Sequence, residues 1–289
     1  MHTEDEVELK VEQFNDSDVS NLIELSSSVC WDYDDQEIKT ILSSGKIFGH
    51  KNSKGKIVSS AAIVPYDTNL ASIGMVIVHS DYRGFGLGKK VTQQCIARVS
   101  KETSIMLIST EDGKPLYESL NFRTVDAVHK FLCEDFVCAT LEVNNEFTLE
   151  TYKVGDFHQV MVLDSAAFGG KRSKFLHNRI EQSKRCIVVK NQNREIVGFG
   201  LSVQGPINLL VGPVVAPDFK TAASIMKELA ANHHGNLRID VPSGHHDFMT
   251  FLHTCGFNKV NEPPVMMKNS STMPHRDGRL YGIAAQVFG

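Results

Sequence analysis

Residues 73–89 read IGMVIVHSDYRGFGLGK, and this stretch decides the fold. Its first half is apolar and rich in β-branched side chains, which is typical of a buried strand. Its second half places glycines at positions 84, 86 and 88, just before a run with helical character. Glycine adopts the backbone conformations that a sharp turn requires. The stretch therefore predicts a strand, a glycine-rich turn and a helix in succession.

The glycine-rich turn is suited to binding a phosphate group. Alternating glycines at the start of a helix let successive backbone N–H groups converge on one point, where the positive end of the helix dipole adds to them. A pyrophosphate is the ligand that this arrangement favours. The alternative is that the glycines serve only to turn the strand into the helix.

Three familiar nucleotide-binding loops differ from this turn in detail. The dinucleotide-binding pattern is Gly-x-Gly-x-x-Gly, whereas the glycines here are evenly spaced. A P-loop has four residues between its glycines and a Ser or Thr after its Lys, whereas Lys90 follows Lys89. The kinase glycine loop lies between strands and does not precede a helix.

Arg83, Gly86 and Gly88 follow a strand in the spacing Arg-x-x-Gly-x-Gly. This pattern resembles the GNAT superfamily of acyl-CoA N-acyltransferases. Residues 117–122, YESLNF, resemble the Tyr-x-x-x-Gly-Phe segment of the same superfamily, and only Asn121 departs from it. The resemblance implies a fold that binds acetyl-CoA as cosubstrate.

The resemblance extends over nearly the whole chain. Residues 31–32, 73–76, 110–117, 211–213 and 239–242 together look like the tandem-domain acetyltransferases of the YitH/HolE type. In such proteins the first GNAT domain is expected to hold the coenzyme, and the second packs beside it.

The order of expected elements supports an internal duplication. Residues 78–83 can be aligned with 215–220, and residues 116–122 with 251–257. We therefore predict an α/β fold, with α+β mixed sheets, made of two tandem GNAT-like domains. Each domain should have a mixed, mostly antiparallel sheet flanked by helices. Residues 1–137 form the coenzyme-binding domain and residues 145–289 a degenerate copy with a docked tail.

The resemblance also implies the residues that hold acetyl-CoA. The strand end should separate from its neighbour and pair with the pantetheine arm, with one N–H facing the thioester carbonyl. The backbone of the glycine turn should bind the pyrophosphate, with Lys89 near the adenosine phosphates. The expected coenzyme-binding residues are Val76, Ile77, Val78, Arg83, Gly84, Phe85, Gly86, Leu87, Gly88 and Lys89.

Tyr117 occupies the position at which the superfamily places a tyrosine hydroxyl near the departing thiolate. The resemblance implies that it acts as general acid; the alternative is a helix tyrosine packed on the sheet. The attacking amine must also lose a proton, but residues 71–78 contain no carboxylate. Asp32, Asp34 and Glu111 are candidates for the base, and none is assigned.

The second copy lacks the features of the first. Thr221, Ala223 and Ile225 align with the three glycines, and Leu252 aligns with Tyr117. Side chains at those positions would fill the turn, and leucine has no proton to donate. We expect one coenzyme site per chain, in the first domain.

Residues 30–35, CWDYDD, join the first two expected helices, where this fold caps the acceptor cleft. Trp31, Asp32 and Tyr33 offer an aromatic wall with carboxylates, which suits a cationic amine. The alternative is a helix cap with one core tryptophan. The resemblance keeps Arg172 open as an acceptor-pocket residue. The apolar residues 279–289 are expected to dock across the domain interface and to reach the acceptor.

The function predicted from these features is transfer of an acetyl group to a primary amine of a small molecule, by direct attack in a ternary complex. One alternative is a protein acetyltransferase acting on lysine or an N-terminal amine. Another is an acyl-CoA-binding sensor without catalysis, which is suggested by the missing strand carboxylate and by Asn121.

Composition excludes several other classes. Thirty Lys and Arg residues against 34 Asp and Glu, without a basic stripe, argue against nucleic acid as a partner. No window resembles a membrane span or a signal peptide, so a cytoplasmic or nucleocytoplasmic protein is expected. Six scattered cysteines without a Cys-x-x-Cys pair, and His pairs without helical ligand spacing, predict no metal site. A homodimer remains compatible with these features.

Overall fold

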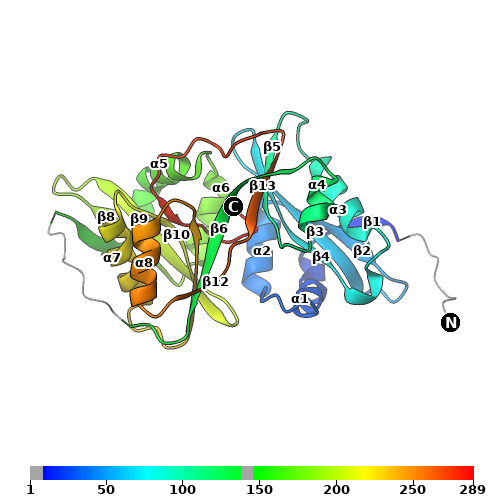
Figure 1. The fold of residues 1–289 in the computed structure, drawn as a ribbon, viewed down its shortest axis with the longest axis horizontal. Helices are drawn as coiled ribbons and strands as arrows, with labels where there is room; N and C mark the ends of the chain where they lie inside the picture. Colours follow the sequence, from blue (N-terminus) through cyan, green and yellow to red (C-terminus); the bar gives the residue numbers. More distant parts are fainter. Residues whose placement is uncertain (1–8, 138–145) are drawn as a thin grey trace.

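The computed structural model describes residues 9–137 and 146–289. It has two halves that lie side by side, with β6 and β13 between them (Figure 1). The first half contains β1 (Val11–Phe14), α1 (Val19–Ser27), α2 (Asp35–Ser44), β2 (Lys46–Lys51), β3 (Ile57–Pro65), β4 (Leu70–Val78), α3 (Leu87–Ile96), β5 (Ser104–Ile108), α4 (Lys114–Glu118) and β6 (Arg123–Cys133). The second half contains β7 (Thr148–Thr151), α5 (Phe157–Phe168), α6 (Ser173–Gln182), β8 (Arg185–Lys190), β9 (Ile196–Gln204), β10 (Asn208–Val215), α7 (Phe219–Ala230), β11 (Asn236–Pro242), α8 (His246–Thr254), β12 (Asn258–Asn261), β13 (Pro264–Lys268) and β14 (Leu280–Gly282).

The two halves repeat one pattern of strand pairing. In the first half β1 to β4 pair as an antiparallel meander, and β4 then pairs with β5 in parallel. In the second half β7 to β10 form the same meander, and β10 pairs with β11 in parallel. The predicted fold of two domains with mixed, mostly antiparallel sheets and flanking helices is confirmed.

Strand β3 shows why the sheet of the first half is covered on both faces. Successive side chains of a strand point to opposite faces. Accordingly Ala62 and Val64 join the core that includes Leu22 of α1 and Ile41 of α2. Ala61 and Ile63 join the core on the other face, which includes α3 and α4 residues. The almost continuous apolar run of β3 therefore reflects helices on both sides of the sheet.

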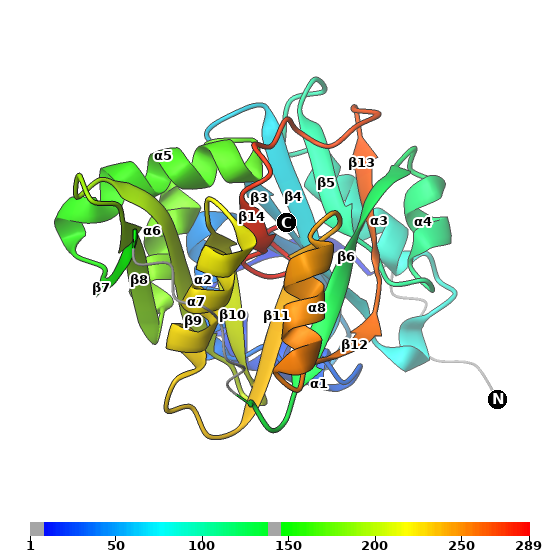
Figure 2. The same ribbon diagram turned by 60° about the vertical axis from the view of Figure 1, so that its left-hand side comes forward.

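Two strands join the halves: β13 lies in the sheet of the first half, and β6 pairs with strands of both sheets. Residues 264–268, which form β13, lie in the sheet of the first half, between β5 and β6. Strand β6 pairs with β13 along residues 123–127 and with β11 along residues 128–133. Figure 2 shows β6 running between β11 and β13. Strand β6 is therefore one long strand that belongs to both sheets. Strand pairing thus crosses the expected boundary at residues 137–145.

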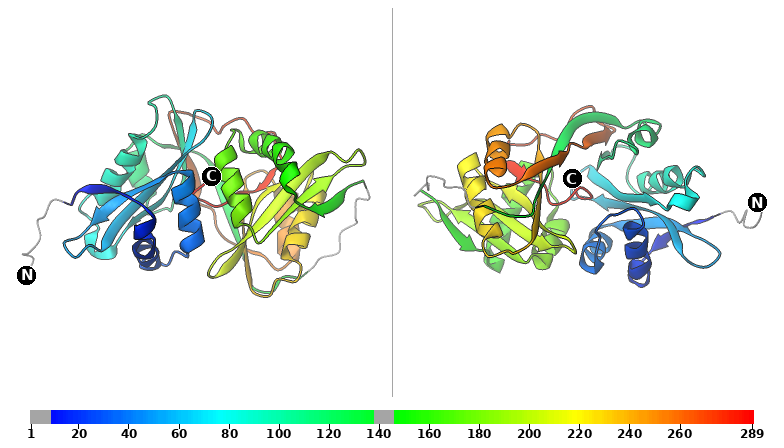
Figure 3. Two further views of the ribbon diagram at one scale, coloured as in Figure 1. Left: turned by 180° about the vertical axis from the view of Figure 1, so that it is seen from behind. Right: turned by 60° about the horizontal axis from the view of Figure 1, so that its bottom comes forward.

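Helices α2 and α6 also pack against each other where the halves meet (Figure 3). Arg179 of α6 forms an ion pair with Glu37 of α2, with Nη1 and Oε2 2.5 Å apart. Asn178 donates hydrogen bonds to the hydroxyls of Ser43 and Ser44. These contacts hold the loop before α2 close to the second half.

The end of the chain passes between the halves, as predicted for residues 279–289. Strand β14 pairs with β10 in the second half. Beyond it, Ala284 accepts a hydrogen bond of 2.7 Å from Arg179, and Phe288 accepts one of 2.5 Å from the Tyr66 hydroxyl. The terminal segment approaches β10 closely at Gly212, where a Cβ atom would lie 1.9 Å from the Ile283 carbonyl oxygen. Docking of this segment across the interface is confirmed.

A cavity between the two halves as the candidate active site

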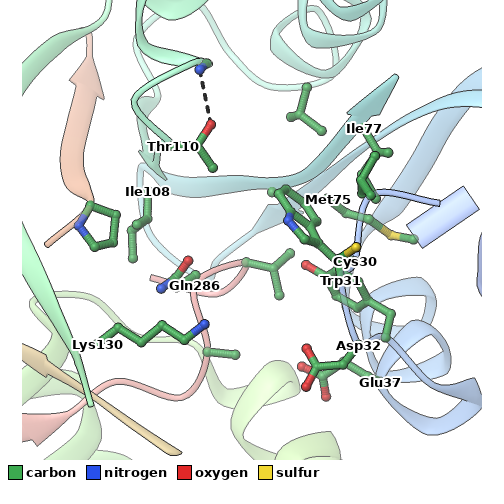
Figure 4. A pocket seen from close by; sticks show the side chains of 18 of the residues that line it. Cys30, Trp31, Asp32, Glu37, Met75, Ile77, Ile108, Thr110, Lys130 and Gln286 are labelled. Atoms are coloured by element: carbon green, nitrogen blue, oxygen red, sulfur yellow. Dashed lines mark hydrogen bonds between the residues drawn. The ribbon is translucent and has the colours of Figure 1, made fainter. Parts of the chain in front are cut away.

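A cavity of about 740 Å³ lies where the two halves meet. Figure 4 looks into it, with Trp31, Asp32 and Glu37 on one side and Lys130 and Gln286 on the other. Its wall is contributed by both halves and by the docked terminal segment. Among the expected site residues it includes Trp31, Asp32, Tyr33, Val76, Ile77, Val78, Arg83, Gly88 and Tyr117.

One wall of the cavity is the place where β4 separates from β5. Their parallel pairing ends with Ile73 opposite Leu107. Just beyond, a register shift against β3 coincides with Met75, whose φ is +52°. The Ser60 hydroxyl supports this bulge by donating a hydrogen bond of 2.8 Å to the Met75 carbonyl. The predicted separation of the strand end is confirmed, and it turns the edge of residues 76–78 toward the cavity.

The glycine turn follows directly. Gly84 and Gly86 have φ values of +85° and +72°, which few residues other than glycine adopt. Gly86 is the N-cap of α3 and provides no side-chain cap. The first N–H groups of a helix have no acceptor within the helix. A Cβ atom at Gly84 or Gly86 would meet nothing within 4 Å, so the space beside these two glycines is open.

The remaining residues of the turn differ in their exposure. Phe85 is 68% exposed and Lys89 is exposed as well, whereas Leu87 is buried in the core. A Cβ atom at Gly88 would make ordinary contacts of 3.4 Å with Leu116 and Val78. Gly84, Phe85, Gly86, Leu87 and Lys89 are not part of the cavity wall and lie beside its mouth. The open turn and the separated strand fit a pyrophosphate and the pantetheine arm that would extend from it into the cavity.

Tyr117 lies on α4 and lines the cavity. Its side chain is only 7% exposed, and its ring packs edge-on against Phe122 with a centroid distance of 6.0 Å. Burial, followed by the nearby Cys95, raises the pKa of the Tyr117 hydroxyl well above its ordinary value. A tyrosine hydroxyl is protonated at neutral pH already at its ordinary pKa, and the raised pKa extends the protonated range to higher pH.

Asn121, which departs from the family pattern, has a φ of +64°. The aligned residue of the second half, Gly256, also has a positive φ, of +89°. Asparagine tolerates this left-handed region better than most residues. The departure therefore preserves the turn that follows α4.

The loop between α1 and α2 forms the opposite wall. The rings of Trp31 and Tyr33 are 6.3 Å apart, and Asp32 accepts a hydrogen bond of 3.4 Å from Asn208 of β10. Asp34 is the N-cap of α2 and accepts a hydrogen bond of 2.7 Å from the Glu37 backbone. Burial raises the pKa of the Asp34 carboxyl. Burial and the Glu37 carboxylate likewise raise the pKa of Tyr33.

Several polar residues of the cavity were missed by the sequence analysis. Lys130 of β6, Asn208 of β10, Arg238 of β11 and Gln286 of the terminal segment all line it. Arg238 forms an ion pair with Asp240, at 2.7 Å between Nη2 and Oδ2. The available signal was a charged residue within an otherwise apolar strand, as in residues 128–133 and 237–241.

Arg172, which the resemblance left open as an acceptor-pocket residue, is not in the wall of this cavity. Its side chain is fully buried and forms a bidentate ion pair with Asp164, with both N–O distances 2.8 Å. Its guanidinium also lies 3.8 Å from the centroid of the Phe168 ring and donates a hydrogen bond of 3.4 Å to the Phe288 carbonyl. Through these contacts the Arg172 guanidinium holds the terminal segment in place.

The corresponding region of the second half is filled. The β10–β11 pairing ends with Val211 opposite Ile239, and β14 pairs with β10 just beyond that point. The start of α7 is capped by Asp218, which accepts a hydrogen bond of 2.8 Å from the Thr221 backbone. The three residues aligned with the glycines are buried: Thr221, Ala223 and Ile225. Neither a free strand edge nor an open helix start remains.

Among residues 9–137 and 146–289, no group of three or more His, Cys, Asp or Glu side chains is placed to hold a metal ion. Of the helices in the same ranges, none has the length and apolar character needed to cross a membrane.

The fold is that of a two-domain acyltransferase. Residues 26–133 and 160–282 each match a family model described as an acetyltransferase (GNAT) domain. YitH of Bacillus subtilis (strain 168), an uncharacterized N-acetyltransferase, is 38% identical over 278 residues, which cover 96% of this chain and 97% of YitH. The chain belongs to the GNAT family of acetyltransferases, as a tandem-domain member. Such a fold implies an acyl-CoA donor and an acceptor.

Solved structures show the same tandem fold at low identity. A Pyrococcus horikoshii protein superposes over the full length of both chains, with a TM-score of 0.79 and 18% identity. A tandem GNAT protein from the clavulanic acid biosynthesis pathway has a TM-score of 0.65 at 12% identity, covering 90% of this chain and 98% of its own. These similarities concern the fold alone.

Proposed function

We propose that the chain transfers the acetyl group of acetyl-CoA to a primary amine of a small molecule, within a ternary complex. The observation that carries this proposal is the cavity of about 740 Å³, which joins the separated edge of β4 to a polar region built by both halves. A cavity enclosed by two domains and the terminal segment suits a compact acceptor. A folded protein substrate would require a shallow, open groove.

The first half holds the donor in this proposal. The free edge of residues 76–78 pairs with the pantetheine arm, and a backbone N–H of this edge faces the thioester carbonyl. The N–H groups at the start of α3, with Gly84 and Gly86 open in front of them, bind the pyrophosphate. Lys89 and Arg83 add positive charge on the same side.

The chemistry is a direct attack. The amine nitrogen bonds to the acetyl carbon, the carbon–sulfur bond breaks, and Tyr117 gives its proton to the departing thiolate. The proton that the nitrogen loses as the amide forms passes through solvent and restores the Tyr117 hydroxyl. The amine must first be neutral, which costs roughly 4 to 5 kcal/mol at pH 7 for a reference pKa of about 10.4. Trp31 and Asp32 attract and orient the amine, through the aromatic face and the carboxylate.

The second half supplies part of the acceptor pocket and no second donor slot in this proposal. Strand β14 and the Asp218 cap occupy the places that the donor uses in the first half. The degenerate copy therefore serves as a wall.

The test is a measurement of thiol release from acetyl-CoA with the purified full chain. The acceptor panel contains amino acids, polyamines, arylalkylamines, amino sugars and short peptides, and mass spectrometry identifies each product. Acetylation of a small amine supports the proposal. Acetylation of peptides alone would favour a protein acetyltransferase, and tight binding of acetyl-CoA without any turnover would favour a sensor.

A further inference from the structure

Lys130 lines the acceptor region of the cavity with its ammonium group. Its side chain extends from β6 toward the interior of the cavity, beside Gln286 (Figure 4). In the part of the chain that the structure describes, the Lys130 ammonium group makes neither a hydrogen bond nor an ion pair. It is partly buried, and burial, followed by the neighbouring Arg238, lowers the pKa of its ammonium group. A partly buried charge without a partner is costly for a protein to keep.

The nearby carboxylates already have partners. Asp240, opposite Lys130 across the β6–β11 pair, accepts from Arg238 at 2.7 and 3.1 Å and from Gln286 at 3.4 Å. Asp32 accepts from Asn208 at 3.4 Å. Glu37 accepts from Arg179 at 2.5 Å and from Gln182 at 2.8 Å. The Lys130 ammonium is therefore left available to a ligand.

We propose that Lys130 binds a carboxylate of the acceptor, so that the acceptor is a compact amine that also carries a carboxylate, such as a free amino acid. This inference rests on the function proposed above. Arg238 uses Nε and Nη2 on Asp240, and its charge lies beside Lys130. Gln286 adds an amide at the same place. A carboxylate accepts hydrogen bonds from donors of this kind, and charge strengthens them.

The charges of the cavity match the two ends of such an acceptor. Trp31 and Asp32 face the ammonium end, and Lys130 and Gln286 lie across the cavity from them (Figure 4). The volume of about 740 Å³ must also admit the pantetheine arm and the acetyl group. The remaining space suits a free amino acid better than a peptide.

The experiment compares amino acids with the amines that they become on losing the carboxylate: phenylalanine with phenethylamine, leucine with 3-methylbutylamine, and lysine with cadaverine. The kcat/KM with acetyl-CoA is measured for each pair, in the wild type and in Lys130→Met. We expect the wild type to favour the carboxylate-bearing member of at least one pair by about 10-fold or more. In Lys130→Met, KM for that acceptor should rise about 10-fold, while the decarboxylated amine changes less than about twofold.

Further variants keep the test decisive. Lys130→Arg, which retains the charge, should recover part of the preference, and Lys130→Gln replaces Lys130→Met should the latter fail to fold. Lys101→Met, an exposed lysine outside the cavity, is the matched control. Retained acetyl-CoA binding verifies that each variant is folded.

Three results would overturn the inference. The first is turnover of amines with no carboxylate preference and no dependence on Lys130. The second is turnover restricted to an amino sugar phosphate, which points to a different anion. The third is a fall of kcat for both members of every pair with a changed pH profile, which indicates a proton acceptor. If acetyl-CoA binds but no amine of any class is acetylated, the proposed function itself fails, and that result is distinct from the other three.

Discussion

At the scale of single residues, the cavity depends on the environment of a few side chains. Burial raises the pKa of the Tyr117 hydroxyl above its ordinary value. Gly86 holds a conformation at +72° that opens the start of α3. Arg172 does not line the cavity, although arginine is common in binding sites, because its guanidinium forms a buried ion pair with Asp164.

Replacing Tyr117 by Phe tests the proton donor. We expect kcat to fall about 100-fold, within the range typical of a lost general acid, while the Kd of acetyl-CoA changes little. The raised pKa adds a pH prediction. Tyr117 loses its proton only above its ordinary pKa of about 10, so it causes no loss of kcat between pH 7 and pH 9.

Steady-state rates under conditions where chemistry limits turnover, with calorimetry for the coenzyme, provide the measurement. Tyr152→Phe removes a hydroxyl from the second half and serves as the control. An unchanged kcat in Tyr117→Phe would remove this residue from the mechanism.

Replacing Gly86 by Ala tests the glycine turn. Alanine meets no steric obstacle there, but the left-handed backbone costs it roughly 1 to 2 kcal/mol. We expect a weaker Kd for acetyl-CoA, by about 10-fold, as the N–H groups lose their alignment. Gly155→Ala is the matched control, because Gly155 also has open space around it and lies in the second half. Equal coenzyme affinities in the two variants would argue against a pyrophosphate site at this turn.

At the scale of elements, the exchange of strands and the docked terminal segment matter most. Strand β13 completes the sheet of the first half although it belongs to the end of the chain. The terminal segment passes between the halves and provides Ala285, Gln286 and Val287 to the cavity. A Cβ atom at Gly74 would lie only 2.5 to 2.7 Å from Val287 atoms, so β4 and this segment are in close contact.

Arg172→Met tests whether the buried Arg172–Asp164 ion pair stabilises the docked terminal segment. The substitution leaves Asp164 buried without its partner, which typically costs about 3 to 5 kcal/mol of the free energy of unfolding. Arg194→Met, which breaks a surface pair with Glu150 at a side chain 65% exposed, should cost less than about 1 kcal/mol. Urea unfolding measures both. A normal stability combined with a raised KM for the acceptor would instead return Arg172 to substrate binding.

At the scale of the whole molecule, two copies of one domain have diverged into different roles. The first half keeps an open strand edge and an uncapped helix start. In the second half β14 and Asp218 occupy the equivalent places. Under the proposed function, duplication supplies a scaffold in which one copy binds the donor and both copies line the acceptor pocket.

This division predicts the stoichiometry of coenzyme binding. Isothermal titration of the full chain with acetyl-CoA should give one site per chain, and Gly86→Ala should weaken that site. A second site of comparable affinity, unaffected by Gly86→Ala, would show that the second half binds the coenzyme after all.

The sequence alone determined the local structure of the proposed coenzyme site. The strand, the glycine turn and the helix are contiguous within residues 73–89, and their backbone conformations depend on local residue types. The repeated order of elements and the burial of residues 279–289 were predictable for the same reason, since both are patterns along the chain.

Only the tertiary structure decided the acceptor side. Asp32, Lys130, Arg238 and Gln286 are far apart in the sequence and meet because the halves pack together and the chain end returns between them. The position of β13 between β5 and β6 could not be predicted from the sequence either, because a short apolar strand does not specify which strands it will pair with. Local residue types determine a turn, but contacts between distant segments determine a pocket.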